Sequence, residues 1–183
     1  MAIEIERKFL LKNDDWRRGA DGKDIHGLEL RQGYLCQSKS GATVRVRQAG
    51  DRAFLTIKGP AGKSGLPAKT DQGMNENANA PGCDFSRSEY EYEIPLADCR
   101  AMLNELAEKP IIEKTRYLVE DHGMTWEVDE FHGENAGLIL AELELESADQ
   151  PYHRPDWLGE EVTGDPRYIN ANLVRNPYSK WRS

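Results

Sequence analysis

The sequence predicts an α+β fold that is mainly β, with about eight antiparallel strands closed into a barrel. Two observations carry this prediction. First, segments in which apolar and charged residues strictly alternate recur along the 183-residue chain, and a period of two is typical of a half-buried strand. Second, short turn signals separate most of these segments, and antiparallel hairpins need only short connections. Eight antiparallel strands suit a closed barrel just wide enough to hold one small ligand.

The expected strands follow one another along the chain. The first, AIEIERKFLL at residues 2–11, alternates apolar with charged side chains from Glu4 onward. Turn sequences at 38–41 and 49–51 separate the second, third and fourth strands, which predicts hairpins at both places. The complete set of expected strands is 2–11, 25–37, 42–49, 52–58, 85–94, 111–120, 124–131 and 138–147.

Helices are expected at three places between and after these strands. Residues 13–15 can cap a short helix around Trp16. Apolar residues at helical spacing predict a second helix over 96–107. Near the C-terminus Asp165 is a suitable N-cap and Pro166 suits the first helical position, so a third short helix should begin there.

The segment 59–84 interrupts this regular order. It is rich in Gly, Pro, Asn and Lys and has no periodicity, and loops of this length in compact domains are often lids or disordered insertions. We therefore expect one domain over residues 1–183 with a mobile insertion at about 59–84, which is the default organisation for a chain of this length.

Composition narrows the class of protein. The chain has 24 basic and 32 acidic residues and a net charge of -8, whereas a nucleic-acid binder usually carries a basic footprint. The three cysteines have no disulfide or zinc-ligand spacing and are expected to be buried thiols. No apolar run approaches the length of a membrane span, and the N-terminus is acidic where a signal peptide is basic. We expect a cytoplasmic protein that binds neither nucleic acid nor membrane; a homodimer is left open.

The charged residues of the strands come in doublets and triplets of one sign. Two arrangements compete. In a conventional barrel or sandwich the charges face the solvent, whereas in an inverted barrel they line the lumen and helices cover an apolar exterior. Adjacent like charges on a strand are unfavourable, and such clusters suggest a ligand of opposite charge. The alternation alone leaves both arrangements open.

An ordered set of motifs resembles the CYTH superfamily, the triphosphate tunnel metalloenzymes. The motifs are EIERK at 4–8, RVR at 45–47, TIK at 56–58, SRSEYEYE at 86–93, EKTR at 113–116, EVD at 127–129 and AELELE at 141–146. The resemblance covers nearly the whole chain and implies an eight-stranded antiparallel tunnel whose lumen carries the charges, with helices packed outside. Two features depart from the family: the insertion after Gly59, and the absence of the His-Phe pair that precedes the first motif in class IV adenylyl cyclases.

The lumen chemistry suits a tripolyphosphate. Arg binds phosphate oxygens with two donors and Lys adds point charge. Hard ions such as Mg²⁺ or Mn²⁺ prefer carboxylate and phosphate oxygens together. The predicted substrate-binding residues are Lys8, Arg45, Arg47, Lys58, Arg87, Lys114 and Arg116. The predicted metal ligands are Glu4, Glu6, Glu142 and Glu144, and the predicted catalytic residues are Glu4, Glu6, Lys8 and Arg116. The residues expected to orient the basic side chains are Glu89, Glu91 and Asp129. For each residue, the alternative is a lumen salt bridge without a ligand role.

The expected function is metal-dependent hydrolysis of inorganic triphosphate to diphosphate and orthophosphate, because short one-domain members of the family include bacterial triphosphatases. Nucleoside triphosphatase, thiamine triphosphatase and class IV adenylyl cyclase activities stay open. A non-catalytic sensor of polyphosphate or nucleotides is the alternative from a different class.

Overall fold

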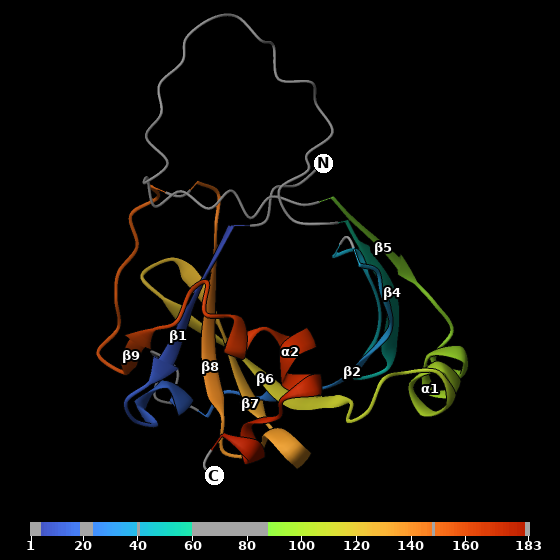
Figure 1. The fold of residues 1–183 in the computed structure, drawn as a ribbon. Coiled ribbons are helices and arrows are strands. Elements are labelled where there is room, and N and C mark those ends of the chain that lie inside the picture. Colours follow the sequence, from blue (N-terminus) through green and yellow to red (C-terminus); the bar gives the residue numbers. More distant parts are fainter. Residues whose placement is uncertain (1–4, 19–23, 40, 60–87, 148, 182–183) are drawn as a thin grey trace, which may run out of the picture.

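The described residues fold around one curved antiparallel sheet of nine strands, accompanied by two α-helices (Figure 1). The computed structural model describes residues 5–18, 24–39, 41–59, 88–147 and 149–181. The strands are β1 (Ile5–Leu11), β2 (Gly27–Gln37), β3 (Thr43–Ala49), β4 (Arg52–Lys58), β5 (Glu89–Glu93), β6 (Ile112–Asp121), β7 (Met124–Phe131), β8 (Ile139–Leu145) and β9 (Leu158–Glu161). Their order in the sheet is β5-β4-β3-β2-β6-β7-β8-β1-β9.

The sheet is open, so the prediction of an eight-stranded closed barrel is wrong in strand number and in closure. The short strand β9 pairs with the outer edge of β1. Beyond β9 the same edge is held by the backbone N–H of Val162, which donates to the Lys8 carbonyl at 2.8 Å, and by Thr163, whose Oγ1 accepts from the Lys8 N–H at 3.0 Å. These bonds occupy the β1 edge that closure against β5 would need. Strands β5 and β9 are therefore the two edges of the sheet.

Most of the expected elements are present close to their predicted bounds. The helix over 96–107 is α1 (Leu96–Glu105), and the residues after 13–15 form the 3₁₀ helix η1 (Asp15–Arg17). The C-terminal helix is divided into a 3₁₀ turn, η3 (Pro166–Tyr168), and α2 (Asn170–Arg175). The Asp165 carboxylate accepts the Arg167 N–H, as expected of an N-cap. The fifth strand begins at Glu89, after the non-strand residue Ser88. Residues 85–87 and the predicted insertion beyond Gly59 lie outside the described residues.

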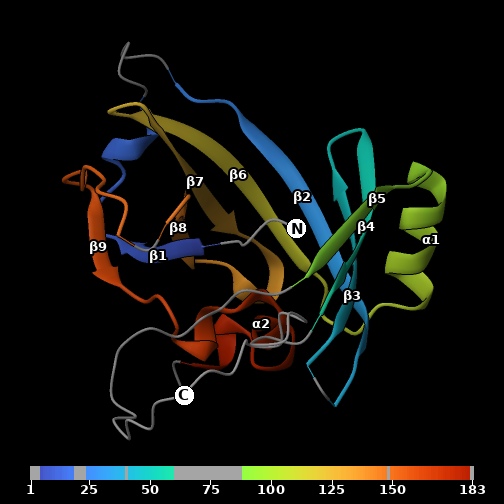
Figure 2. The same cartoon turned by 90° about the horizontal axis from the view of Figure 1, so that it is seen from above.

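The two faces of the sheet differ in chemistry, and the register shows which is which. We call the face that carries Lys8, Lys114, Asp129 and Glu142 the inner face. Figure 2 shows the concave side of the sheet between β1 and β9 on one side and β3, β4 and β5 on the other, with α2 lying on it. Because α2 packs on Ile112 and Leu140, which lie in the same rows as Lys114 and Glu142, the inner face is the concave one. The residues that alternate with these along each strand, such as Leu143 next to Glu142 in β8, point to the opposite, outer face. The inverted arrangement, with charges inside the curve, is therefore confirmed.

Apolar groups cover the outer face in two clusters. Against β3 and β4, Cys99 and Leu103 of α1 pack on Val46 and Ala53. On the β1–β8 side the cluster is built on aromatic contacts, including Phe9 with Trp126 at a 5.7 Å centroid distance, and its buried members are Phe9, Trp16, Val119, Trp126, Val128, Ala141, Leu143, Leu145, Trp157 and Leu158. The expectation that helices would pack outside holds for α1.

Helix α2 lies on the inner face, contrary to the expectation that all helices would pack outside. Its Leu173 and Val174 pack with Ile112, Phe131 and Leu140, which lie in the same inward rows as the charged residues but at one end of them. Figure 2 shows α2 between the two sides of the curved sheet. The charged rows consequently end on an apolar floor.

Two further expectations can be compared with the described residues. Cys99 is a buried thiol, whereas Cys36 is exposed, so the prediction of buried cysteines is wrong for Cys36; Cys83 lies outside the described residues. Among the described residues, neither α-helix has the length and apolar character needed to cross a bilayer.

The apolar floor should contribute measurably to stability. Leu173 is fully buried, so Leu173→Ala should lower the free energy of unfolding by about 2–5 kcal/mol. In a domain of this size the melting temperature would then fall by roughly 2–4 °C per kcal/mol. Leu106, at 63% exposed, is the matched control, because surface truncations have small effects. An equal shift in both variants would contradict the assigned packing of α2.

Candidate active site

The register of the sheet brings the charged doublets together on the inner face. Lys8 lies opposite Glu142 and Glu6 lies opposite Glu144 across β1 and β8. Arg116 lies opposite Asp129 across β6 and β7. Directly opposed residues of antiparallel strands share a face and have close side chains. Residues that are far apart in sequence therefore form two groups, which we call the central cluster and the β3–β5 cluster.

The central cluster consists of Lys8, Lys114, Arg116, Asp129 and Glu142. Arg116 binds Asp129 with two parallel contacts, Nε to Oδ1 at 2.7 Å and Nη2 to Oδ2 at 2.6 Å. Its Nη2 also donates to Glu142 Oε2 at 3.2 Å, and Lys8 Nζ pairs with Glu142 Oε1 at 2.8 Å. Lys114 pairs with the fully buried Asp129. The bidentate contact fixes the plane of the Arg116 guanidinium.

Burial and pairing set the charge states of this cluster. Burial alone would raise the pKa of Glu142, but Lys8, Lys114 and Arg116 outweigh it and hold that pKa well below its usual range. Burial would likewise lower the pKa of Lys8, but Glu142 and Glu6 raise it above its ordinary value. At neutral pH both groups are therefore charged.

The depressed pKa of Glu142 predicts a pH dependence of stability. At pH values between the usual glutamate pKa of about 4.3 and the lower pKa of Glu142 in the folded protein, the unfolded chain binds more protons than the folded one. The free energy of unfolding therefore rises with pH in this interval. We expect the melting temperature to fall as the pH drops below about 5, and to fall less steeply in Glu142→Gln. Parallel slopes for the two proteins in thermal melts from neutral to acid pH would contradict this.

The β3–β5 cluster consists of Arg45, Arg47, Lys58, Glu89 and Glu91. Lys58 Nζ contacts Glu89 Oε2 at 3.0 Å, and Arg47 Nη2 contacts Glu91 Oε2 at 3.2 Å. Arg45 Nη2 lies 3.7 Å from Glu91 Oε2. The buried Nε atoms of Arg45 and Arg47 have no hydrogen-bond partner among the described residues. Both acids thus contact the bases that they were predicted to orient, while the guanidinium groups keep donor capacity.

The two clusters act on each other electrostatically. Burial is the largest cause of the lowered pKa of Arg47, and the positive charges of Arg45 and Arg116 lower it further. Arg116 belongs to the central cluster, so basic groups from both sides of the sheet repel one another across the inner face. An anion bound between them would relieve this repulsion.

The predicted metal ligands are only partly described. Glu4 lies outside the described residues, as does the predicted substrate ligand Arg87. Glu6 and Glu144 are exposed on the inner face, whereas Glu142 is bound by Lys8 and Arg116. Within the described ranges, these three carboxylates do not form a group close enough to share one ion as they stand. The donor set is all carboxylate oxygen, which fits a hard divalent ion.

Two residues of the inner face were not expected in the site. Glu127 was given no role, but it pairs with Arg116, and burial is the largest cause of its raised pKa. Gln32, only 1% exposed, lies opposite Arg47, and its Nε2 has no partner within the described part of the chain. Glu127 lies two residues from Asp129 on one strand, so the spacing could have placed it on the same face. No pattern in the sequence indicated Gln32, since its position opposite Arg47 depends on the pairing of β2 with β3.

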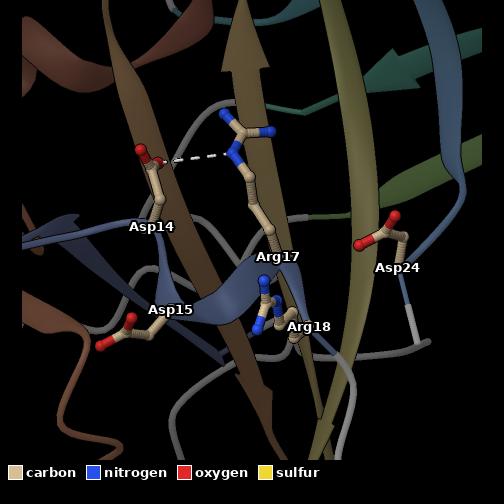
Figure 3. Close-up of a pocket in the computed structure, with 5 residues that line it drawn as sticks. All are labelled: Asp14, Asp15, Arg17, Arg18 and Asp24. Carbon is tan, nitrogen blue, oxygen red and sulfur yellow. Dashed lines mark ion pairs between the residues drawn. The ribbon is translucent and has the colours of Figure 1, made fainter. Parts of the chain in front are cut away.

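A surface hollow of about 510 Å³ lies elsewhere, beside η1. Figure 3 shows the residues that line it, with an ion pair between Asp14 and Arg17. It contains no residue of either charged cluster, and its lining is Asp14, Asp15, Arg17, Arg18 and Asp24. The hollow mixes charges of both signs and lacks convergent donors for an anion, so we do not place the active site there.

Comparison with known proteins identifies the family and its relatives. The CYTH domain family matches residues 2–178. An inorganic triphosphatase of Acetivibrio thermocellus is 44% identical over 182 residues, which span 100% of this chain and 99% of that protein. An inorganic triphosphatase of Nitrosomonas europaea is 36% identical over 174 residues, spanning 93% and 96% of the two chains. The crystal structure of the inorganic triphosphatase NE1496 has a TM-score of 0.61 at 34% identity and covers 95% of each chain.

Proposed function

The chain belongs to the CYTH family, and on that premise we propose that it hydrolyses inorganic triphosphate to diphosphate and orthophosphate with the help of a divalent metal ion. The observation that carries the proposal is the set of basic groups that meet on the inner face from both sides of the sheet. Its Arg45 and Arg47 keep buried N–H donors without a partner among the described residues. Relatives of similar length named as inorganic triphosphatases support this substrate.

The basic groups match the charge of a tripolyphosphate. We assign the phosphates to Lys8, Lys114 and Arg116 of the central cluster and to the bases of the β3–β5 cluster. Asp129 holds Arg116 with two contacts, which reduces the ordering needed when a phosphate binds. Gln32, opposite Arg47, is a further donor that faces the same side. Glu89 and Glu91 act as positioning residues through their contacts with Lys58 and Arg47.

A Mg²⁺ or Mn²⁺ ion would be held by Glu4, Glu6, Glu142 and Glu144. Bound there together with phosphate oxygens, the ion would neutralise charge on the phosphate to be transferred. Glu6 and Glu144 are neighbours across β1 and β8. Because Lys8 Nζ lies only 2.8 Å from Glu142 Oε1, the basic side chain of Lys8 and the carboxylate ligands would contact the same end of the substrate.

The chain contributes mainly position and charge to the reaction. Phosphoryl transfer needs little covalent chemistry from the protein. Arg116 and Lys8 stabilise negative charge on the departing diphosphate, since preorganised donors act most strongly where charge develops. The apolar floor under α2 closes one end of the charged rows and limits water there.

A phosphate-release assay with tripolyphosphate, ATP, thiamine triphosphate and diphosphate, in Mg²⁺ or Mn²⁺, tests the proposal. We expect fast orthophosphate release from tripolyphosphate and slow release from the others. Preference for ATP or thiamine triphosphate would replace the substrate, and cyclic AMP from ATP would indicate a cyclase. Tight binding of tripolyphosphate without release would indicate a sensor and overturn the enzyme assignment.

The remaining expectations stay predictions. They are a single domain over residues 1–183, a cytoplasmic location and an oligomeric state in which a homodimer is left open. Size-exclusion chromatography with light scattering measures the last directly.

A further inference from the structure

We propose that Asp121, His122 and His153 form a second metal site, specific for a transition-metal ion of the Zn²⁺ class. The site joins the turn between β6 and β7 to the segment that precedes β9. None of its three residues belongs to the central or the β3–β5 cluster. The ligand atoms of these three side chains all lie within 4.8 Å of one another.

The donor atoms already converge on one point. Asp121 Oδ2 accepts a hydrogen bond from His153 Nδ1 at 2.7 Å and one from His122 Nδ1 at 3.1 Å. The two imidazole rings are stacked, with centroids 3.8 Å apart and planes inclined by 32°. Around a tetrahedral ion with bonds of about 2.0–2.2 Å, ligand atoms lie roughly 3.3 Å apart. A small outward movement of the rings would therefore admit an ion.

The backbone of His122 lies in the left-handed region. His122 has a φ of 47° and Gly123 a φ of 79°, and the two residues join Asp121 to Met124 in a hairpin. Positive φ at both central positions favours Asn-Gly in a two-residue hairpin. The histidine is thus present at a position where the turn alone would favour asparagine. The turn and the contact with Asp121 together hold the His122 imidazole beside that of His153.

The donor chemistry selects the ion. Two imidazole nitrogens and one carboxylate suit Zn²⁺, Cu²⁺ or Ni²⁺, whereas Mg²⁺ demands oxygen ligands. Burial alone would raise the pKa of Asp121, but the hydrogen bonds from His153 and His122 lower it, so the carboxylate is ionised at neutral pH. The His122 and His153 side chains are 65% and 48% exposed, which leaves the ion accessible from solvent and room for a water as fourth ligand.

Zn²⁺ titration of the full-length, chelator-treated protein by calorimetry, in excess Mg²⁺ to saturate oxygen-ligand sites, tests the proposal. We expect one Zn²⁺ per wild-type chain at this site, and His122→Asn or His153→Gln should weaken its binding by about tenfold or more, since even outer contacts of metal ligands contribute that much. Asn fits the left-handed turn, so His122→Asn should fold at least as well. His26→Gln and His132→Gln, which change the other two histidines, should bind as wild type does.

Thermal melts distinguish metal binding from a purely structural hydrogen bond. Zn²⁺ should raise the melting temperature of the wild type and of the two control variants, and should have little effect on His122→Asn. Hydrolysis of tripolyphosphate with Mg²⁺ should be unchanged in all four variants. Equal Zn²⁺ affinity in wild type and His122→Asn, or no saturable Zn²⁺ binding below about 1 mM, would overturn the proposal and leave the proposed triphosphatase activity intact.

Discussion

Arg116→Leu should lower the turnover of tripolyphosphate by about 10²–10³-fold, the loss measured when one preorganised charge-stabilising donor is removed. Arg116 is the residue that connects the site: its guanidinium contacts Asp129, Glu142 and Glu127. If its contact with the substrate strengthens as charge moves onto the leaving diphosphate, kcat should fall more than KM rises. The measurement is steady-state phosphate release over a range of substrate concentrations.

The leucine also leaves Asp129 without one of its two cationic partners, and removing one member of a buried ion pair can destabilise by about 3–5 kcal/mol. Arg116→Lys separates the two effects, because it retains the charge but loses the planar fork. Arg7→Leu is the matched control: Arg7 adjoins Lys8 on β1 but pairs with Glu161 on the outer face. A change confined to KM would limit Arg116 to substrate binding, and wild-type turnover in a folded Arg116→Leu variant would remove Arg116 from the reaction.

Glu144→Gln should reduce activity by orders of magnitude, with partial recovery at high Mg²⁺ or Mn²⁺. Glutamine keeps the shape of the side chain and removes its charge, so the affinity for a hard ion falls while the fold is retained. Glu144 lies opposite Glu6 in the register of β1 and β8, which is the reason to expect a shared ion. The assay is phosphate release as a function of metal concentration at saturating tripolyphosphate.

The matched control is Glu161→Gln, which changes a carboxylate on the outer face that is paired with Arg7. Its metal dependence should equal that of the wild type. Near wild-type turnover of Glu144→Gln at low metal concentration would remove Glu144 from the metal site. Glu4→Gln should behave as Glu144→Gln does, because Glu4 shares the spacing of Glu6 on the same N-terminal segment.

Much of the candidate site followed from the sequence because strand periodicity is local. Side chains two residues apart on a strand share a face, so Arg45 with Arg47, and Lys114 with Arg116, were assigned to one face each before any pairing was known. The order of the motifs along the chain then indicated the family. Alternation could not say which face was concave, since both faces repeat with the same period.

Only the tertiary structure decided that the sheet stays open and what fills its curve. The edge of β1 is occupied by residues 158–163, about 150 positions away along the chain, and no local pattern encodes a contact over that separation. Strand β9 has four residues, too few for a periodic signal. Helix α2 lies inside the curve because Leu173 and Val174 find their apolar partners at the end of the charged rows. The sequence by itself determined which residues share a face; pairing over long separations, which depends on backbone hydrogen bonds common to all residues, decided which of those faces meet.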